Sequence, residues 1–516
     1  MYANIFQKSK VRGGGHDIII RGMETKHSLV MVNGRRISNE ADASGLGNAM
    51  SLDRININDV EKIEIVRGPS SALYGSEAMG GVLNIITKPS KEQTLLTGLE
   101  HTSEDTSHWW HADTGRIGNF SMTLDARFNK INRSMLDTAT ESDPYGTAQT
   151  YNASLNYYVN DHSYVNAYMD YYSQHLKTDT GTPTMKPITL TTSRGMSLSG
   201  QAMLEGTGSK AYKQKNYGIS WNGKTDKNDW QIQAYMSKFN WSTTSNTKVL
   251  GSIPPAGMEG MFNFLLQKKN TYDFNHDEHN MWAIEGRDSL RVNDHHRVTF
   301  GAEYVKDKVA GTGLGSNGDG VHSITENGKT KSSSEKTLSS YAAYLQDEIE
   351  YGKWFIVPAI RYDHHSAYGS HTSPKIGVTY NATDHFRIKA NYGDGFKAPS
   401  VSQLYYDLDM EMGRGNWVHL TGNPNLKPEK SKSWDLGVEA EFGKGYGSLT
   451  YFDNDVDNLI TSIPKGKDSN GHNLHRYENV NKARIKGLEN TLGYRFNDTL
   501  EFKVTSTQKT RALGKI

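Results

Sequence analysis

The charged and aromatic residues that could bind a ligand lie in two segments of the sequence. One segment begins with the pair Arg35-Arg36. The other runs from residue 396 to residue 430 and contains Tyr405, Tyr406, Arg414, Trp417 and His419. Guanidinium groups together with aromatic rings suit an anionic ligand, since the guanidinium forms charge-assisted hydrogen bonds and the rings offer flat apolar faces. The alternative is that both segments are ordinary polar loops, in which such residues are common.

Patterns for catalysis or metal binding are missing from the sequence. It contains no G-x-S-x-G, no HExxH, no phosphate-binding loop and no dinucleotide fingerprint in a βαβ setting. It has no Cys, which excludes disulfides, thiolate zinc sites, iron–sulfur clusters and a catalytic thiol. The pairs His295-His296 and His364-His365 are predicted at strand ends, where adjacent residues face opposite ways, so we interpret them as solvated. We expect neither an enzyme nor a permanently bound cofactor.

The composition favours a large β protein. Among 516 residues there are 50 Gly, 28 Tyr and 9 Trp but only 13 Pro. Lys and Arg number 58 and Asp and Glu 57, without the basic excess of a nucleic-acid-binding protein. The mean hydropathy is −0.68, and no apolar stretch approaches the roughly 18–20 residues of a transmembrane helix. A membrane β-barrel stays possible, because its lumen-facing positions are polar.

The pattern of the chain changes near residue 90. Residues 1–90 contain short apolar runs between Gly-rich turns, which predict a compact unit. A short helix is expected over 70–79, with Ser70 as its cap, and glycines 68, 75, 80 and 81 punctuate this part. The predicted strands are 17–20, 28–32, 60–66 and 82–87.

From about residue 92 the sequence alternates between apolar and polar residues. In one segment Trp434, Leu436 and Val438 share a face, and Asp435 and Gly437 share the other. Roughly 17–19 such segments occur, each near the length that spans an outer membrane. Short turns alternate with long polar connections, which is typical of an outer-membrane β-barrel. The long connections are about 174–210, 244–270, 310–335 and 396–430.

Three segments resemble a known family. They are IRGM at 20–23 with LVMVNG at 29–34, VEKIEIVRGPSSALYGSEAMGGVLNIIT at 60–87, and FKAP at 396–399 with GNPNLKPE at 422–429. Together they resemble a TonB-dependent outer-membrane receptor, and the resemblance covers nearly the whole chain. It implies an all-β membrane protein, in which a small α+β plug (1–90) fills a large antiparallel transmembrane barrel (91–516) of about 22 strands.

The resemblance also implies a function. Such a receptor imports an iron chelate into the periplasm, driven by the TonB-ExbB-ExbD complex, and it is a monomer in the lipid of the bacterial outer membrane. A ferric siderophore is the first expectation for the ligand, and haem or cobalamin is the alternative. An outer-membrane barrel enzyme is the alternative from another class, which a plug argues against.

Both ends of the chain depart from the family pattern. The sequence opens inside the plug, without the signal peptide and the TonB-coupling box, and it ends in TQKTRALGKI, without a terminal aromatic residue. We therefore expect a chain truncated at both ends, whose barrel stays incomplete and whose residues after Thr507 are unrelated to the barrel.

The resemblance assigns roles to a few residues. His419 occupies the interval in which haem receptors carry an axial ligand, although the expected apex loop, 35–51, contains no second histidine. For a siderophore, the arginine and aromatic residues of the two segments above would bind the anionic chelate.

A charge lock between plug and barrel is also expected. By period two, Asp435 and Glu489 face the lumen, where an unpaired charge is costly. Arg21 and Arg67 precede Gly22 and Gly68, which leave room for a close approach to the wall. We predict that these two arginines meet the two carboxylates, as in the plug–barrel charge cluster of the family.

Overall fold

The structure is a computed structural model, and it describes most of the chain. The described residues are 4–7, 16–23, 25–37, 60–88, 92–103, 105–133, 144–179, 183–192, 195–411, 417–468 and 471–513. Arg414 and the greater part of the expected apex loop lie outside them. Among the helices of the described residues, none combines the length and the apolar character needed to cross a membrane.

The N-terminal part forms two small sheets. Strands β1 (Asn4–Gln7) and β2 (His16–Ile19) pair with each other, and a 3-10 turn, η2 (Thr25–His27), follows them. A four-stranded sheet has the order β4-β3-β6-β5. Its strands are β3 (Ser28–Val32), β4 (Arg35–Arg36), β5 (Val60–Arg67) and β6 (Gly81–Thr87), with β3 and β6 parallel. The four strands predicted here are therefore present, with bounds shifted by at most one residue.

The helix predicted over 70–79 is much shorter than expected. Helix α3 covers only Ser71–Tyr74, and Ser70 makes no side-chain cap, because its Oγ donates to the carbonyl of Gly68 at 3.1 Å. Gly75 ends the helix at a φ of 68°, a conformation that a residue with a Cβ rarely adopts. The prediction was wrong because it passed over this glycine.

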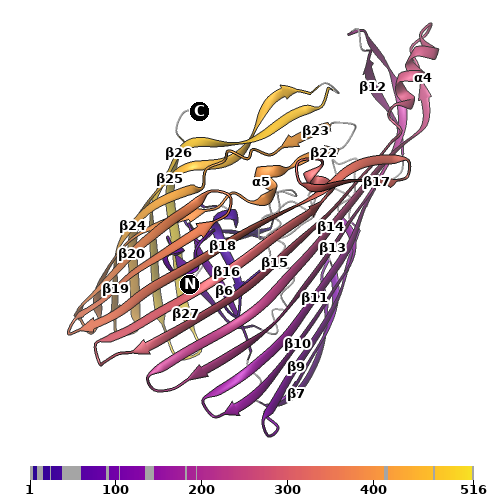
Figure 1. Cartoon of the computed structure of the whole chain (residues 1–516). Coiled ribbons are helices and arrows are strands. Elements are labelled where there is room, and N and C mark those ends of the chain that lie inside the picture. Colours follow the sequence, from indigo (N-terminus) through magenta and orange to yellow (C-terminus); the bar gives the residue numbers. More distant parts are fainter. Residues whose placement is uncertain are drawn as a thin grey trace.

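The second part is a closed barrel around the first part, and its successive wall strands are antiparallel (Figure 1). In the described part of the chain, its wall consists of seventeen strands: five from β7 to β11, four from β13 to β16, four from β18 to β21 and four from β24 to β27. The wall strands are β7 (Gln93–His101), β8 (Asp105–Thr114), β9 (Phe120–Ile131), β10 (Tyr145–Asn160), β11 (Ser163–Asp179), β13 (Ser197–Lys224), β14 (Asn228–Ile253), β15 (Thr271–Arg291), β16 (His296–Gly311), β18 (Lys329–Tyr351), β19 (Trp354–His365), β20 (Gly369–Thr383), β21 (Phe386–Lys397), β24 (Glu429–Phe442), β25 (Gly445–Lys467), β26 (Asn473–Arg495) and β27 (Glu501–Leu513).

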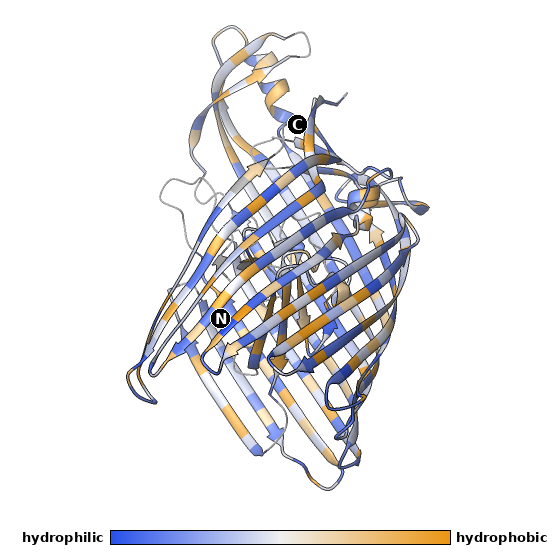
Figure 2. Cartoon of the chain, turned by 90° about the vertical axis from the view of Figure 1, so that its left-hand side faces the viewer, coloured by the Kyte–Doolittle hydropathy of each residue, from blue (hydrophilic) through white to orange (hydrophobic). Residues whose placement is uncertain are grey.

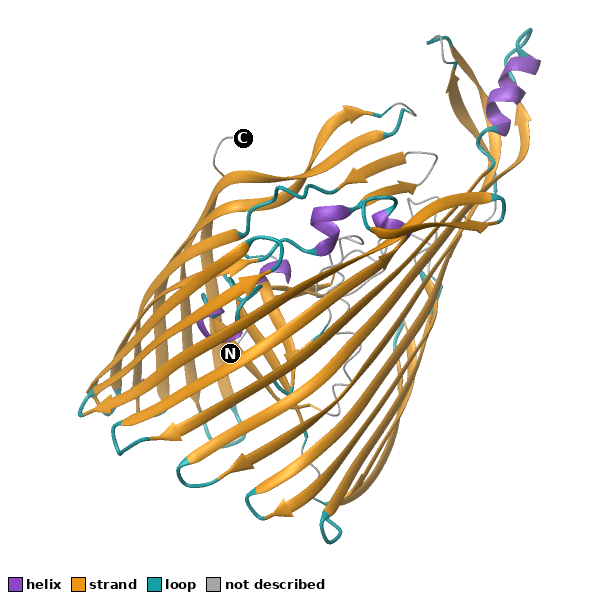
Figure 3. Ribbon diagram, viewed as in Figure 1, coloured by secondary structure: helices purple, strands orange, loops and turns teal. Residues whose placement is uncertain are grey.

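The connections differ at the two ends of the barrel. Tight turns join the strands at one end, and long connections extend from the other, which we call the long-loop end (Figures 1 and 3). The long connections contain β12 (Met185–Thr191), α4 (Glu259–Gln267), η4 (Thr312–Leu314), β17 (Asp319–Glu326), α5 (Val401–Tyr405), β22 (Asp407–Glu411) and β23 (Trp417–Thr421). The alternation of short and long connections agrees with the sequence prediction.

Side-chain alternation places one face of each wall strand outward and the other toward the lumen. In β24, Trp434 and Leu436 are 45% and 51% exposed, whereas Asp435 between them is 7% exposed. Figure 2 shows the same residue-by-residue change of hydropathy along the wall strands. The apolar outward face is what a lipid environment requires, and the polar inward face borders the enclosed domain.

The end of the chain differs from our expectation. Residues after Thr507 continue β27, whose pairing with β26 extends to Ala483 opposite Leu513, so they belong to the wall. Strand β27 also neighbours β7, which closes the barrel. All successive wall pairs are antiparallel and seventeen is odd, so β27 and β7 run in the same direction where they meet. The wall has fewer strands than the 22 of the family, as expected, and these strands nevertheless close into a barrel.

Candidate functional site

We call the enclosed N-terminal part of the described chain, up to residue 88, the plug. Its first contact with the barrel wall is an arginine–carboxylate cluster. Arg21 Nη1 donates to Asp435 Oδ2 at 2.9 Å, and its Nη2 and Nε donate to Glu489 Oε2 at 3.2 and 3.3 Å. Arg67 Nη1 lies 3.4 Å from the same Glu489 oxygen. We call Arg21, Arg67, Asp435 and Glu489 the first plug–wall cluster. The structure brings together all four residues that the sequence analysis grouped.

The local backbone geometry explains how the Arg21 side chain approaches the wall carboxylates. Arg21 and Gly22 form a tight turn with φ of 51° and 81°, which turns the guanidinium toward the wall. Gly68 has a φ of 77°, and a Cβ there would lie 3.3 Å from Arg21 Nη1. The glycine therefore leaves room for the guanidinium. The ring of Phe452 lies 4.9 Å from Arg21 Cζ and adds a cation–π contact.

A second cluster lies on a different part of the wall, and the sequence analysis missed it. Arg361 in β19 bonds to Glu303 of β16, and its Nε donates to Asp363 at 2.9 and 3.1 Å. Its Nη1 donates to the Leu73 carbonyl of the plug at 3.2 Å. Arg36 of the plug lies 3.7 Å from Glu303. We call Arg36, Glu303, Arg361 and Asp363 the second plug–wall cluster.

A glycine also makes room in the second cluster. A Cβ at Gly75 would lie 2.8 Å from Arg361 Nη2, closer than real Cβ contacts allow. The α3 segment therefore presents its backbone to the wall, where the Leu73 carbonyl accepts from Arg361. Within the plug, Arg36 donates to the carbonyls of Tyr74 and Ser76. The alternation of β19 could have placed Arg361 and Asp363 on one face. No sequence pattern shows that a plug carbonyl would accept from Arg361.

The segments that carry the family resemblance touch one another. The backbone N–H of Phe396 donates to Ser71 Oγ at 3.2 Å, and that of Ala398 donates to Ser76 Oγ at 3.0 Å. The fully buried Glu429 accepts from the backbone N–H of Ile460 at 2.9 Å, and its other oxygen lies 2.6 Å from His27 Nε2. The segment at 60–87 thus contacts the segment at 396–399, which in turn pairs with the segment at 422–429 through Lys397 opposite Glu429.

Arg35 and Arg36 contact the wall. The Arg35 guanidinium lies 3.4 Å from the ring centroid of Tyr168 in β11, at a cavity of about 630 Å³ between plug and wall. Arg36 belongs to the second cluster. Among the described contacts, the structure does not bring this pair together with the predicted ligand residues of the 396–430 segment. Arg414 lies outside the described residues.

The remaining predicted residues lie at the long-loop end. Tyr406 is buried in a cluster with Leu404 and Leu420, so it is a core residue of the folded loops. Tyr405 and Trp417 are partly exposed, with Lys336 Nζ at 5.1 Å from the ring of Tyr405 and Lys329 Nζ at 5.7 Å from that of Trp417. The cations beside these two aromatic rings are thus lysines, which the sequence analysis did not identify.

His419 is engaged with two carboxylates. Its Nδ1 lies 2.9 Å from Asp409 Oδ1, and its Nε2 lies 3.4 Å from Asp407 Oδ1. Either nitrogen would have to leave a carboxylate before it could bind haem iron. The haem role of His419 therefore stays a prediction.

Comparisons with known proteins agree with this architecture. The family model "TonB dependent receptor-like, beta-barrel" matches residues 150–514, and the "TonB-dependent Receptor Plug Domain" model matches residues 2–82. The chain is 26% identical to the ferric enterobactin receptor of Pseudomonas aeruginosa, over 96% of this chain and 71% of that protein. It is 25% identical to the ferrienterobactin receptor of Escherichia coli, over 95% and 69%.

Other relatives carry a different ligand name. The vitamin B12 transporter BtuB of Photobacterium profundum is 25% identical, over 93% of this chain and 67% of that protein.

Among solved structures, the siderophore receptor PirA of Pseudomonas aeruginosa superposes with a TM-score of 0.69 at 22% identity, covering 96% of this chain and 79% of that one. This chain therefore belongs to the TonB-dependent receptors, a family of outer-membrane transport receptors that are not enzymes.

Proposed function

We propose that this protein imports a ferric siderophore across the bacterial outer membrane. The observation that carries the proposal is a closed barrel whose lumen holds a separate domain, attached to the wall by charged groups. Ion pairs can exchange partners while a domain moves, whereas an apolar seal resists sliding. The arrangement suits a passage that is closed at rest and opened by work on the plug.

The choice of a siderophore has two supports. Relatives similar over nearly the whole chain are named as ferric enterobactin receptors. At the long-loop end, the lysine–aromatic pairs of Tyr405 and Trp417 offer cations beside aromatic rings, which suit an anionic, aromatic iron chelate. The iron is cargo within the chelate, and the protein needs no cofactor of its own. Cobalamin is less favoured, because these pairs offer positive charge to an anion.

The proposal includes location and partners. The long-loop end faces the cell exterior, the tight turns face the periplasm, and the apolar outer face contacts outer-membrane lipid. The protein works as a monomer with the TonB-ExbB-ExbD complex.

Ligand titration of the purified protein in detergent tests the proposal. Ferric enterobactin, a second ferric siderophore, haem and cobalamin are added separately while the intrinsic Trp fluorescence is measured. We expect saturable quenching by the ferric siderophore at submicromolar to micromolar concentration. Quenching by haem or cobalamin, with none by ferric enterobactin or another ferric siderophore, would contradict it.

The His419→Ala variant separates the haem alternative. If haem binds through His419, the substitution removes the Soret shift of the bound complex. An unchanged Soret band would exclude His419 as a haem ligand.

A further inference from the structure

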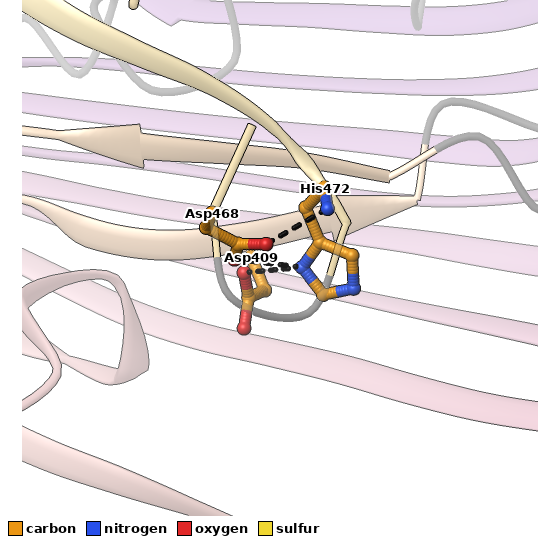
Figure 4. Close-up of side chains that lie close together, drawn as sticks. All are labelled: Asp409, Asp468 and His472. Carbon is orange, nitrogen blue, oxygen red and sulfur yellow. Dashed lines mark hydrogen bonds and ion pairs between the residues drawn. The ribbon is translucent and has the colours of Figure 1, made fainter. Parts of the chain in front are cut away.

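Carboxylates and imidazoles from three separate segments converge at the long-loop end. Asp409 lies in β22, His419 lies in β23, and Asp468 and His472 flank the connection between β25 and β26. Figure 4 shows Asp409, Asp468 and His472 with their polar atoms turned toward one another. Asp409 and His472 are 63 residues apart in the sequence. The fold, and not local sequence, therefore brings them together.

The distances between these groups are short enough for hydrogen bonds, and they also match the distances between ligand atoms around a shared ion. His472 Nδ1 lies 3.3 Å from Asp409 Oδ1 and 3.4 Å from Asp468 Oδ2. Four ligands at zinc bond lengths stand about 3.3 Å from one another in a tetrahedron. The ligand atoms of Asp409, Asp468 and His472 all lie within 4.8 Å of one another. A small movement of these side chains toward one another would place them at three of the four positions of a tetrahedral zinc site. His419 Nδ1 lies 2.9 Å from Asp409 Oδ1 and would hold that carboxylate in place as a supporting group.

Surrounding contacts hold the donors in place. The ring of His472 stacks on Trp417, with centroids 5.3 Å apart and planes 22° apart. The backbone N–H of His472 donates to Asp468 Oδ1 at 2.8 Å, which leaves Oδ2 of that carboxylate toward the imidazole. Strands β23 and β26 pair in parallel, with Val418 opposite Asn473, and this fixes the two loops side by side.

We propose that Asp409, Asp468 and His472 form a binding site for a divalent transition-metal ion, with His419 holding the Asp409 carboxylate as a supporting group. Imidazole nitrogen together with carboxylate oxygen suits Zn²⁺, Cu²⁺ or Ni²⁺ better than Mg²⁺ or Ca²⁺, which prefer oxygen ligands alone. The bound ion ties the β21–β24 connection to the β25–β26 connection. Through the stack on His472 it also holds Trp417. This inference does not rest on the proposed siderophore ligand.

Zinc binding by the whole chain tests the site. The protein is purified in detergent, treated with EDTA, dialysed and titrated with Zn²⁺ by calorimetry. The variants Asp409→Asn and His472→Gln are compared with His322→Gln. His322 is a matched control, because it is an exposed histidine of another long connection whose Nδ1 lies 3.1 Å from the Gly320 carbonyl.

The expected outcome is a single strong site in the unmodified protein and in His322→Gln. Each of the two site variants should weaken its affinity by about tenfold or more, as loss of a ligand or of a close supporting group does. Equal affinity in the control and in both site variants would overturn the proposal. So would the absence of binding by the unmodified protein up to about 1 mM Zn²⁺.

A second measurement covers the case in which the site variants do not fold. Limited proteolysis of the unmodified protein is followed by mass spectrometry, with Zn²⁺ and with EDTA. Cleavage within the described residues 407–411, 417–421 and 471–473 should be faster in EDTA and slow again when Zn²⁺ is restored. Equal cleavage rates in both conditions would overturn the proposal.

Discussion

The two plug–wall clusters use the same chemistry but divide it differently between the plug and the wall. In the first cluster the plug supplies the cations, Arg21 and Arg67, and the wall supplies the anions, Asp435 and Glu489. In the second cluster the wall supplies Arg361 and both carboxylates, and the plug adds Arg36 and backbone carbonyls.

This difference has a consequence for plug movement. If the plug leaves the first cluster, two lumen carboxylates lose the arginines that face them. If it leaves the second cluster, Arg361 keeps Glu303 and Asp363, so the wall remains internally paired. We infer that the first cluster holds the plug mainly through ion pairs between plug and wall. The second cluster is an ion-pair network within the wall, and the backbone of α3 packs against it.

We expect the largest loss of unfolding free energy from the Arg361→Met substitution. The substitution leaves Glu303 and Asp363 without the fully buried guanidinium between them and removes the bond to the Leu73 carbonyl. Breaking such a buried network costs about 3–5 kcal/mol. Because the wall itself loses pairing, the urea midpoint of the barrel should fall together with that of the plug, as followed by hydrogen exchange of peptides from each part. A barrel midpoint equal to that of the unmodified protein would contradict the comparison.

Arg21→Met should act almost as strongly, but on the plug alone. Asp435 and Glu489 lose the donor that lies 2.9 Å from one and 3.2 Å from the other, at a cost of about 3 kcal/mol. Hydrogen exchange should rise in plug residues 16–37 and 60–88, while β24 and β26 stay protected. Arg116→Met is the matched control, because Arg116 and its partner Asp161 are exposed and such a pair contributes about 0–1 kcal/mol. Equal exchange in the two variants would show that Arg21 does not anchor the plug.

Gly75→Ala tests the backbone side of the second cluster. The new methyl group would stand 2.8 Å from Arg361 Nη2, at a φ of 68° that alanine disfavours, so α3 must withdraw from the wall. Strain of this kind costs about 1–3 kcal/mol. Gly34→Ala provides the control, because Gly34 also lies in the plug, its φ is 77°, and the atom nearest to an added Cβ, Gln231 Oε1, is 3.9 Å away. We expect a larger loss of plug stability in Gly75→Ala than in Gly34→Ala, and equal losses would show that the unfavourable φ alone accounts for the effect.

The sequence predicted the parts of this architecture that depend on side-chain alternation. Asp435 between Trp434 and Leu436 faces the lumen, because a strand has two faces and lipid requires the apolar one. Arg21 and Arg67 could be paired with wall carboxylates for the same reason, with help from the family resemblance. Contacts made by backbone, such as Leu73 and Tyr74 carbonyls with arginines, leave no trace in residue type.

The closure of the barrel and the packing of its long connections could not be predicted from the sequence either. The pairing of β27 with β7 depends on the curvature of the whole wall. Tyr406 resembles an exposed loop residue, yet it is buried because α5, η4 and the β22–β23 hairpin pack together. The convergence of Asp409 with His472 likewise depends on the parallel pairing of β23 with β26.

The smallest effect is expected from Arg67→Met, and it sharpens the comparison within the first cluster. The Arg67 side chain is 26% exposed, and its Nη1 lies 3.4 Å from the Glu489 oxygen that Arg21 also contacts. Since Arg21 remains to neutralise Glu489 and water reaches Arg67, the loss should be about 1 kcal/mol or less. In the double variant Arg21→Met/Arg67→Met, Glu489 would lose both donors, so the loss of plug stability should exceed the sum of the single losses. The coupling energy from urea titrations of the four proteins measures this directly. Strict additivity would show that the two arginines act on Glu489 independently, and the first cluster would then be two separate ion pairs.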